Sequence, residues 1–281
     1  MPTFDTSTPI TVELEVGVGE VRVNAGERAD TVVEVLPSDP DKHDDVLAAE
    51  QTRVEFAGGR LLVKAPKNWR RFTPFSDGGS INVRIELPEG SELSGATAMG
   101  SLYASGRLGA CRYSTGMGDV RLDEAGALVL RTGMGDLAVG HTSGDVDVKT
   151  GSGTIQIDGI DGNAQIKNSN GESRIGEAIG DLQVRSANGD ITIGRAHGAV
   201  SAKTAQGKVR MVVEQGSVVA ETGHGALEIG IAEGTAAFLD LSTGFGHVRS
   251  ELGASEPPAD GEHSAEVRAR SGHGDITVRR A

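Results

Sequence analysis

Aromatic residues are scarce in this sequence, where Phe, Trp and Tyr together make up 3% of 281 residues. Such a chain cannot build a thick core of large aromatic side chains, although 37% of it is apolar. Glycine, in contrast, occurs 41 times and permits backbone conformations that other residues avoid. We therefore expect a thin structure with small interior side chains and many turns.

Cysteine and long apolar runs are also rare. The single cysteine, Cys111, cannot form a disulfide within the chain, so nothing here requires an oxidising compartment. No window approaches the ~20 apolar residues that a membrane-spanning helix needs. The first residues show no basic segment followed by an apolar run, and no signal peptide is expected. We predict a cytoplasmic protein without a membrane span.

Positively charged residues are also fewer than negatively charged ones. The chain has 27 Lys and Arg against 40 Asp and Glu, which gives a formal net charge of -13. This balance disfavours non-specific binding of nucleic acid over the whole surface, and no nucleic-acid partner is expected. A local basic patch remains compatible with it.

What the sequence does contain is a repeat. Glycine returns at every ninth position from Gly126 to Gly234. After most of these glycines the second and fourth residues are apolar, as in the "DITI" that follows Gly189. A period of two predicts strands with one buried face, and the glycines mark the corners between them.

Alternate repeats differ, so the true unit has about 18 residues. In one type a second glycine follows, as Gly194 follows Gly189, and we expect it to end a short strand. In the other type a longer strand is expected to end at a small polar residue such as Ser186. Such a unit cannot bury its own apolar face, but stacked coils with parallel pairing can. The predicted fold class is all-β: a single-stranded parallel β-solenoid (β-helix), right-handed by analogy with parallel crossovers.

The two ends of the chain are less regular. Residues 1–93 are predicted to be a capping region with strands and a short helix near residues 41–52. They form either coils with long excursions or a small sheet over the first coil. Residues 94–281 are predicted to be the repeat array. A loop insertion near 252–264, which contains Pro257 and Pro258, precedes a final coil.

Five motifs carry a resemblance to a known family: "GVGEVRV" (17–23), "STGMGDVRL" (114–122), "RTGMGDLAV" (131–139), "SANGDITIG" (186–194) and "SGHGDITV" (271–278). They resemble the bacterial β-strand-repeat family of putative adhesins, also called toastrack domains. The resemblance implies a non-catalytic β-solenoid, of a kind often linked to cell-envelope stress systems. It brings no catalytic motif.

Aspartate directly follows several of the repeat glycines, for example at Asp181 and Asp190. Glycine-rich nine-residue repeats with Asp are also found in calcium-binding β-rolls. Lys208 holds the same place in a neighbouring coil, which opposes a site that needs several converging oxygens. We expect these carboxylates to accept hydrogen bonds from local amides, with no metal, no cofactor and no catalytic residue. Cys111 is expected to point inward as a small core residue.

A column of basic residues is the first candidate binding site. The fifth residue after alternate glycines is basic in five successive repeats: Arg131, Lys149, Lys167, Arg185 and Lys203. Stacking would place these outward side chains about 5 Å apart. Two explanations stay open, namely screening by flanking acids or an electropositive stripe for an acidic partner.

A second candidate lies in the segment "NWRRFTPF" (68–75), with Trp69, Arg70 and Arg71. Trp and Arg are frequent anchors of protein interfaces. The alternative is that the aromatic side chains close an open end of the solenoid.

The function predicted from these features is that of a non-enzymatic binding or scaffold protein. Its flat faces would present side chains to a protein or polyanionic partner. The alternatives are a solenoid enzyme acting on a polysaccharide and a self-assembling structural protein. A homo-oligomer through the end coils is expected as well, because end coils expose unpaired strand edges.

Overall fold

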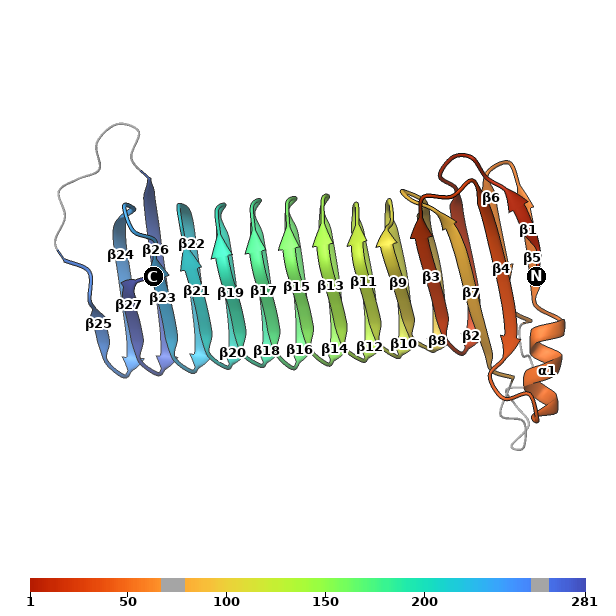
Figure 1. Cartoon of the computed structure of the whole chain (residues 1–281). Coiled ribbons are helices and arrows are strands. Elements are labelled where there is room, and N and C mark those ends of the chain that lie inside the picture. The colour runs from red at the N-terminus through yellow and green to blue at the C-terminus, as the bar shows by residue number, and fades with distance from the viewer. Residues whose placement is uncertain (67–78, 254–262) are drawn as a thin grey trace. The chain divides into compact units, whose positions relative to one another are not determined.

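The computed structural model describes residues 1–66, 79–253 and 263–281. The chain divides into two compact units, Met1–Val139 (unit 1) and Gly140–Ala281 (unit 2). In each unit, strands with mostly parallel neighbours form two sheets, called sheet A and sheet B below (Figure 1). The prediction of an all-β solenoid of stacked parallel strands is confirmed.

The described residues of unit 1 form twelve strands, one α-helix and part of another strand. In spatial order, sheet A contains β1 (Thr3–Asp5), β4 (Asp30–Pro37), β7 (Ile81–Pro88), β3 (Val21–Gly26), β9 (Leu102–Arg107) and β11 (Val120–Ala125). Sheet B contains β5 (Arg53–Ala57), β6 (Arg60–Lys64), β2 (Thr11–Val18), β8 (Glu92–Met99), β10 (Cys111–Met117) and β12 (Leu128–Met134). The helix α1 spans His43–Glu50, and β13 (Leu137–Thr142) contains the unit boundary.

Unit 2 repeats the same two-sheet pattern. Its sheet A contains β15 (Ile155–Ile160), β17 (Ser173–Ala178), β19 (Ile191–Ala196), β21 (Val209–Val213), β23 (Leu227–Ile231), β27 (Ile276–Arg280) and β25 (Val248–Ser250). Its sheet B contains β14 (Val146–Ser152), β16 (Ala164–Asn170), β18 (Leu182–Asn188), β20 (Val200–Gln206), β22 (Gly216–His224), β26 (Ser264–His273) and β24 (Ala236–Phe245).

The coil length follows from the pairing register. Val148 lies beside Ile166, and Ile166 beside Val184, each 18 residues further along the chain. All three side chains are fully buried between the sheets. Because each strand buries one face only when the next coil is present, apolar burial stabilises the stack and not the isolated coil.

Two strand ends differ from the prediction. Gly194 does not end its strand, because β19 continues through it to Ala196. A Cβ at Gly194 would lie 2.4 Å from the carbonyl oxygen of Gly176, so glycine allows close stacking of two strands here. Likewise, β18 continues past Ser186 to Asn188.

The corner glycines are required by both conformation and space. Gly189 has a φ of +151°, and a Cβ there would lie 1.9 Å from the carbonyl oxygen of Gly171. Its own carbonyl oxygen accepts a hydrogen bond of 3.2 Å from the hydroxyl of Thr204, which is buried in the next coil. At this place in the long strands, the hydroxyls of Thr204 and Thr222 therefore each satisfy a corner carbonyl group, whereas that of Ser186 does not.

The N-terminal end of unit 1 is closed. The coil made of β6 and β7 stacks outside the coil of β2 and β3, although it comes later in the sequence. Antiparallel strands β4, β1 and β5 extend the two sheets. Between the two edge strands, the rings of Phe4 and Phe56 lie 5.2 Å apart. Asp45 of α1 accepts a hydrogen bond of 2.8 Å from the amide of Ser80, which anchors the helix beside β7.

At the C-terminal end of unit 2 the spatial order also departs from the sequence order. The last strands of the chain, β26 and β27, insert between earlier ones: β26 pairs with β22 on one side and with β24 on the other. In sheet A, β27 pairs with β23 and β25 in the same way (Figure 1). The coil that ends the stack is therefore β24–β25, and not the final coil of the sequence.

Candidate functional site

The outward face of sheet B in unit 2 carries rows of side chains in register. Strict pairing places Lys149 beside Lys167, then Arg185 and then Lys203. We call these four residues the basic stripe. Their side chains point to solvent because the alternating neighbours, such as Val148 and Val184, fill the interior.

The members of the basic stripe differ in their partners. Lys203 forms an ion pair with Glu221 in the next coil, with Nζ and Oε2 2.8 Å apart. Within the described parts of the chain, no ion pair forms at Lys149, Lys167 or Arg185. Like charges on adjacent strands repel each other mildly. Screening by an acidic residue therefore explains only Lys203, at one end of the basic stripe. The other three cations lie on adjacent strands and have no ion-pair partner among the described residues.

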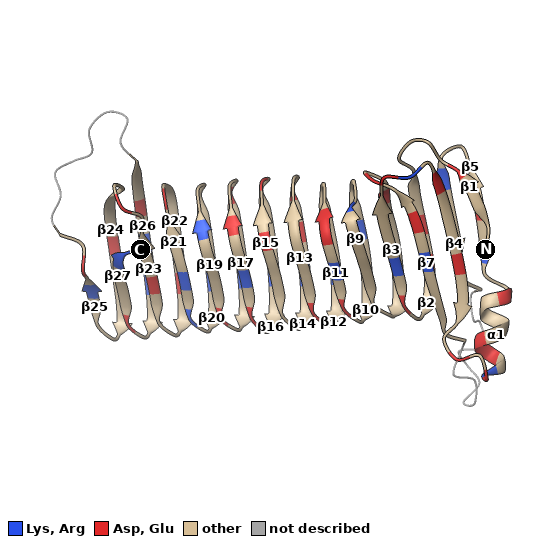
Figure 2. Cartoon of the chain, viewed as in Figure 1, with Lys and Arg blue, Asp and Glu red and all other residues tan. Residues whose placement is uncertain are grey.

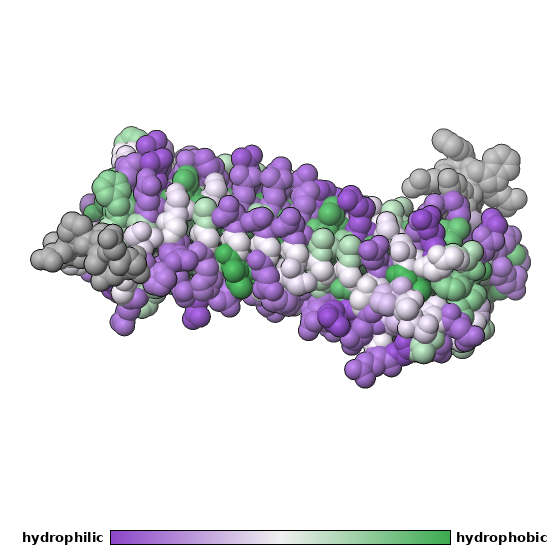
Figure 3. Space-filling model, turned by 90° about the horizontal axis from the view of Figure 1, so that it is seen from above, coloured by the Kyte–Doolittle hydropathy of each residue, from purple (hydrophilic) through white to green (hydrophobic). Residues whose placement is uncertain are grey.

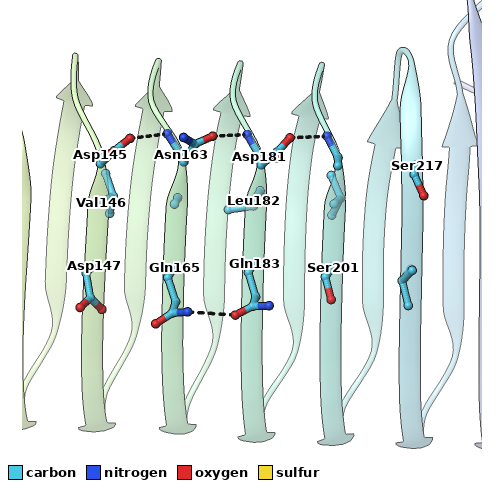
Figure 4. A pocket seen from close by; sticks show the side chains of 14 residues that line it. Asp145, Val146, Asp147, Asn163, Gln165, Asp181, Leu182, Gln183, Ser201 and Ser217 are labelled. Atoms are coloured by element: carbon cyan, nitrogen blue, oxygen red, sulfur yellow. Dashed lines mark hydrogen bonds between the residues drawn. The ribbon is translucent and has the colours of Figure 1, made fainter.

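A groove of about 690 Å³ runs beside the stripe, across β14, β16, β18, β20 and β22 (Figure 4). Its floor carries the row Asp147, Gln165, Gln183 and Ser201, which lies two residues before the stripe on each strand. The amide of Gln165 donates a 3.0 Å hydrogen bond to Gln183. The groove thus offers amide, hydroxyl and carboxylate groups next to the cations of the stripe.

The upper border of the groove is a hydrogen-bonded ladder (Figure 4). The carboxylate of Asp145 accepts a bond of 3.0 Å from the amide of Asn163. The side-chain oxygen of Asn163 accepts one of 3.0 Å from the amide of Asp181, and Asp181 accepts another from the amide of Ala199. Each corner side chain therefore satisfies a backbone amide of the following coil.

The same ladder occurs at the opposite corner, where Asp190 accepts a hydrogen bond of 2.8 Å from the amide of Lys208. At the last coil, the carboxylate of Asp275 accepts a bond of 2.8 Å from the amide of His247, which lowers the pKa of Asp275 below its usual range. The corner aspartates bond to amides one coil away rather than to local ones. Across residues 1–66, 79–253 and 263–281, no group of three or more His, Cys, Asp and Glu could hold a metal ion.

The other residues singled out in the sequence lie elsewhere. Arg131 lies on β12 of unit 1, where its guanidinium donates a 2.9 Å hydrogen bond to the carbonyl oxygen of Leu130. Trp69, Arg70 and Arg71 lie outside the described residues. Cys111 is buried, as predicted, and burial raises the pKa of its thiol to about 12.

Sequence reasoning missed a second surface feature, on sheet A of unit 1. The ring of Tyr103 lies between the guanidinium groups of Arg22 and Arg121, at 5.8 and 5.9 Å from the ring centre. The three residues are in register on adjacent strands and line a groove of about 520 Å³. Each is the third residue after a corner glycine, so this spacing in the sequence would have predicted that the three residues form a row.

Charged residues occur elsewhere in both units as well (Figure 2). Acidic residues are distributed over both units and are prominent on α1 (Figure 2). Hydrophilic side chains cover much of the face seen from above (Figure 3). In the part of the chain that the structure describes, no helix has the length and hydrophobicity needed to cross a membrane.

The fold and its regular rows of surface residues define a repeat protein of the β-solenoid class. The family model of the toastrack proteins (DUF4097) matches residues 10–279, and the chain belongs to this family.

Several solved structures are similar to the chain at low identity. A putative adhesin from Bacteroides fragilis is 14% identical, with a TM-score of 0.36, over 99% of this chain and 95% of its own. A putative lipid binding protein from Parabacteroides distasonis is 12% identical, with a TM-score of 0.42, over 100% and 95%. A putative adhesin from Parabacteroides merdae is 12% identical, with a TM-score of 0.35, over the same shares. No curated protein matches the chain.

Proposed function

We propose that this chain is a non-enzymatic binding protein that holds an acidic or polyanionic partner on the basic stripe of unit 2. The observation that carries the proposal is the alignment of Lys149, Lys167 and Arg185 without a carboxylate partner on a protein of net charge -13. Three cations held at strand spacing would gain energy from a partner with repeated negative charge. The neighbouring groove supplies amides that can donate hydrogen bonds to oxyanions.

The main alternative, an enzyme acting on a polysaccharide, requires a pair of carboxyl groups free to act on a glycosidic bond. The groove does contain Asp145, Asp147 and Asp181. However, Asp145 and Asp181 each hold a backbone amide of the next coil, and Asn163 stands between them in the row. These contacts favour a structural role for both carboxylates.

A link of the partner to cell-envelope stress is part of the proposal and rests on the family resemblance.

The test compares two variants that remove the same number of positive charges. The stripe variant carries Lys149→Gln, Lys167→Gln and Arg185→Gln. The control variant carries three substitutions on the outward face of sheet A, where each arginine is already ion-paired with a glutamate: Arg174→Gln, Arg195→Gln and Arg210→Gln.

Immobilised dextran sulfate is the probe, and affinity is measured over a range of salt concentrations. We expect the wild type and the control to bind alike. The stripe variant should bind more weakly, with the slope of log affinity against log salt reduced by roughly 2 to 3. Equal binding by a folded stripe variant would remove the basic stripe from the function. Release of reducing sugar from polysaccharides by the wild type would favour the enzyme instead.

A further inference from the structure

Unit 2 ends in a coil whose interior is open. Leu239 and Leu241 of β24 are only half-buried, whereas their partners in register on β26, Val267 and Ala269, are fully buried. In sheet A, Val248 is 44% exposed, although Ile276 beside it is fully buried. Among residues 1–66, 79–253 and 263–281, side chains that face the core thus lack a neighbour on one side only, the side beyond β24 and β25.

The backbone of this coil is open on the same side. In the described chain, β24 pairs with β26 alone and β25 with β27 alone. The amide of Ala236 donates to the carbonyl oxygen of His263, next to β26. Since successive residues of a strand direct their amides to opposite neighbours, the amides of Ala237, Leu239 and Leu241 point to the open edge.

The β24 part of this edge lacks the features that usually prevent strand pairing. The ten residues of β24 contain no proline and no lysine, and their one charged side chain, Asp240, is already ion-paired with Arg268. Phe238 and Phe245 are each 70% exposed on the same strand. A long, largely apolar edge whose single charge is already ion-paired is a template for another strand, so the sequence of β24 is suited to a partner strand and poorly suited to solvent.

The partner must itself present a two-stranded edge with an open apolar interior between the strands. The N-terminal end of unit 1 does not offer this. The rings of Phe4 and Phe56 meet between its edge strands β1 and β5, so aromatic side chains occupy the space between the two sheets there. The same terminal coil of a second copy does offer it.

We propose that two copies of this chain pair end to end through their β24–β25 coils. A two-fold axis places β24 antiparallel to β24 of the second copy, so that both surfaces contribute the same residues. Leu239, Leu241 and Val248 of both copies then close one common core. Because the contact pairs the free edge of each copy, assembly ends at a dimer.

The test is the mass of the full chain in solution, measured by analytical ultracentrifugation over a wide range of concentration. We expect twice the mass of one chain for the wild type. Leu241→Lys places a charge in the common core and should raise the dimer dissociation constant by roughly a hundredfold or more. Ser242→Lys adds the same charge at the next residue, on the outward face, and should leave the dimer intact.

A second variant and a second measurement keep the test decisive if Leu241→Lys fails to fold. Ala237→Pro removes an amide that points to the open edge and should separate the copies without removing a bond to β26. Hydrogen exchange at the amides of Leu239 and Leu241 should be slow in the dimer and fast in this variant. A single-chain mass for the wild type at every concentration would overturn the proposal. So would a mass that keeps growing with concentration, or a dimer that survives both variants.

Discussion

The carboxylate of Asp181 accepts a hydrogen bond of 3.0 Å from the backbone amide of Ala199, the residue in the same place one coil later. Asn163, one coil earlier, holds the amide of Asp181 in the same way through its side-chain oxygen. A neutral amide oxygen therefore serves as well as a carboxylate in this ladder. The contact requires an acceptor at the corner and no charge, which separates its structural role from a role in catalysis or metal binding.

This equivalence predicts the response to substitution at Asp181. Asp181→Asn keeps the acceptor and should change the free energy of unfolding by less than about 0.5 kcal/mol. Asp181→Ala leaves the amide of Ala199 without its partner and should cost about 1 kcal/mol. Denaturant unfolding of the two variants checks the difference. Equal losses for Asn and Ala would contradict the ladder and indicate that the charge itself matters.

A corner glycine such as Gly189 should tolerate substitution less well than any other type of residue in the repeat array. Its φ is +151°, and the carbonyl oxygen of Gly171 lies 1.9 Å from the position that a Cβ would take, which leaves no space for a methyl group. We expect Gly189→Ala to cost about 3 kcal/mol or more, because the coils on both sides must shift. Gly17→Ala is the matched control, since nothing lies within 4 Å of its Cβ position. Thermal unfolding should show a large shift for the first variant and almost none for the second.

Substitution of Thr222 tests the role of the buried polar residues that bond to corner carbonyl groups. Its hydroxyl donates a 3.0 Å hydrogen bond to the carbonyl oxygen of Gly207, and its side chain is buried. Thr222→Val keeps the shape and loses the donor, so the corner carbonyl is left unsatisfied at a cost of about 1 to 2 kcal/mol. Thr222→Ser keeps the hydroxyl and should cost clearly less. The order of the two unfolding midpoints by chemical denaturation decides the point: a Ser variant as unstable as the Val variant would exclude a role for the hydrogen bond.

Alkaline pH should destabilise unit 1 through Cys111 and Tyr113. Burial raises the pKa of each group to about 12, from ordinary values of 9.0 and 10.0. Between the ordinary and the raised pKa only the unfolded chain loses these protons. The free energy of unfolding therefore decreases with rising pH from about pH 9 upward, and the contribution is fully present below it.

Substitution of both groups provides the control for this pH dependence. In the Cys111→Ala, Tyr113→Phe variant the decrease in stability above about pH 9 should be smaller than in the wild type. Denaturant unfolding at several values between neutral pH and about pH 11 measures the slope. An unchanged slope would mean that other groups cause the alkaline loss.

The pairing register could be read from the sequence because it depends on local spacing. The interval of 18 residues between Val148, Ile166 and Val184 repeats the interval between their corner glycines. The inward position of Cys111 followed from the same alternation. Strand ends could not be read in this way: Gly194 looks like a terminator in sequence, but it lies inside β19 because the neighbouring strand approaches closely.

The basic stripe, too, could be predicted from the sequence only in part. Alternation alone placed Lys149, Lys167, Arg185 and Lys203 on one outward face. Which of them would meet a carboxylate depends on side-chain contacts between coils, and only Lys203 has one, Glu221, among the described residues. The row of Arg22, Tyr103 and Arg121 was equally regular in sequence, but it joins β3, which comes early in the chain, to the later β9 and β11.

The sequence by itself determined the elements of this protein: alternating strands, glycine corners and a coil of 18 residues, all set by steric and apolar patterns within a few residues. The tertiary structure decided the order of the coils at both ends. There β7 inserts beside β3, and β26 inserts between β22 and β24. Coils of the same length and pattern can pair with any free edge, so local pattern does not choose between them. The choice is made by the core that each arrangement closes or leaves open.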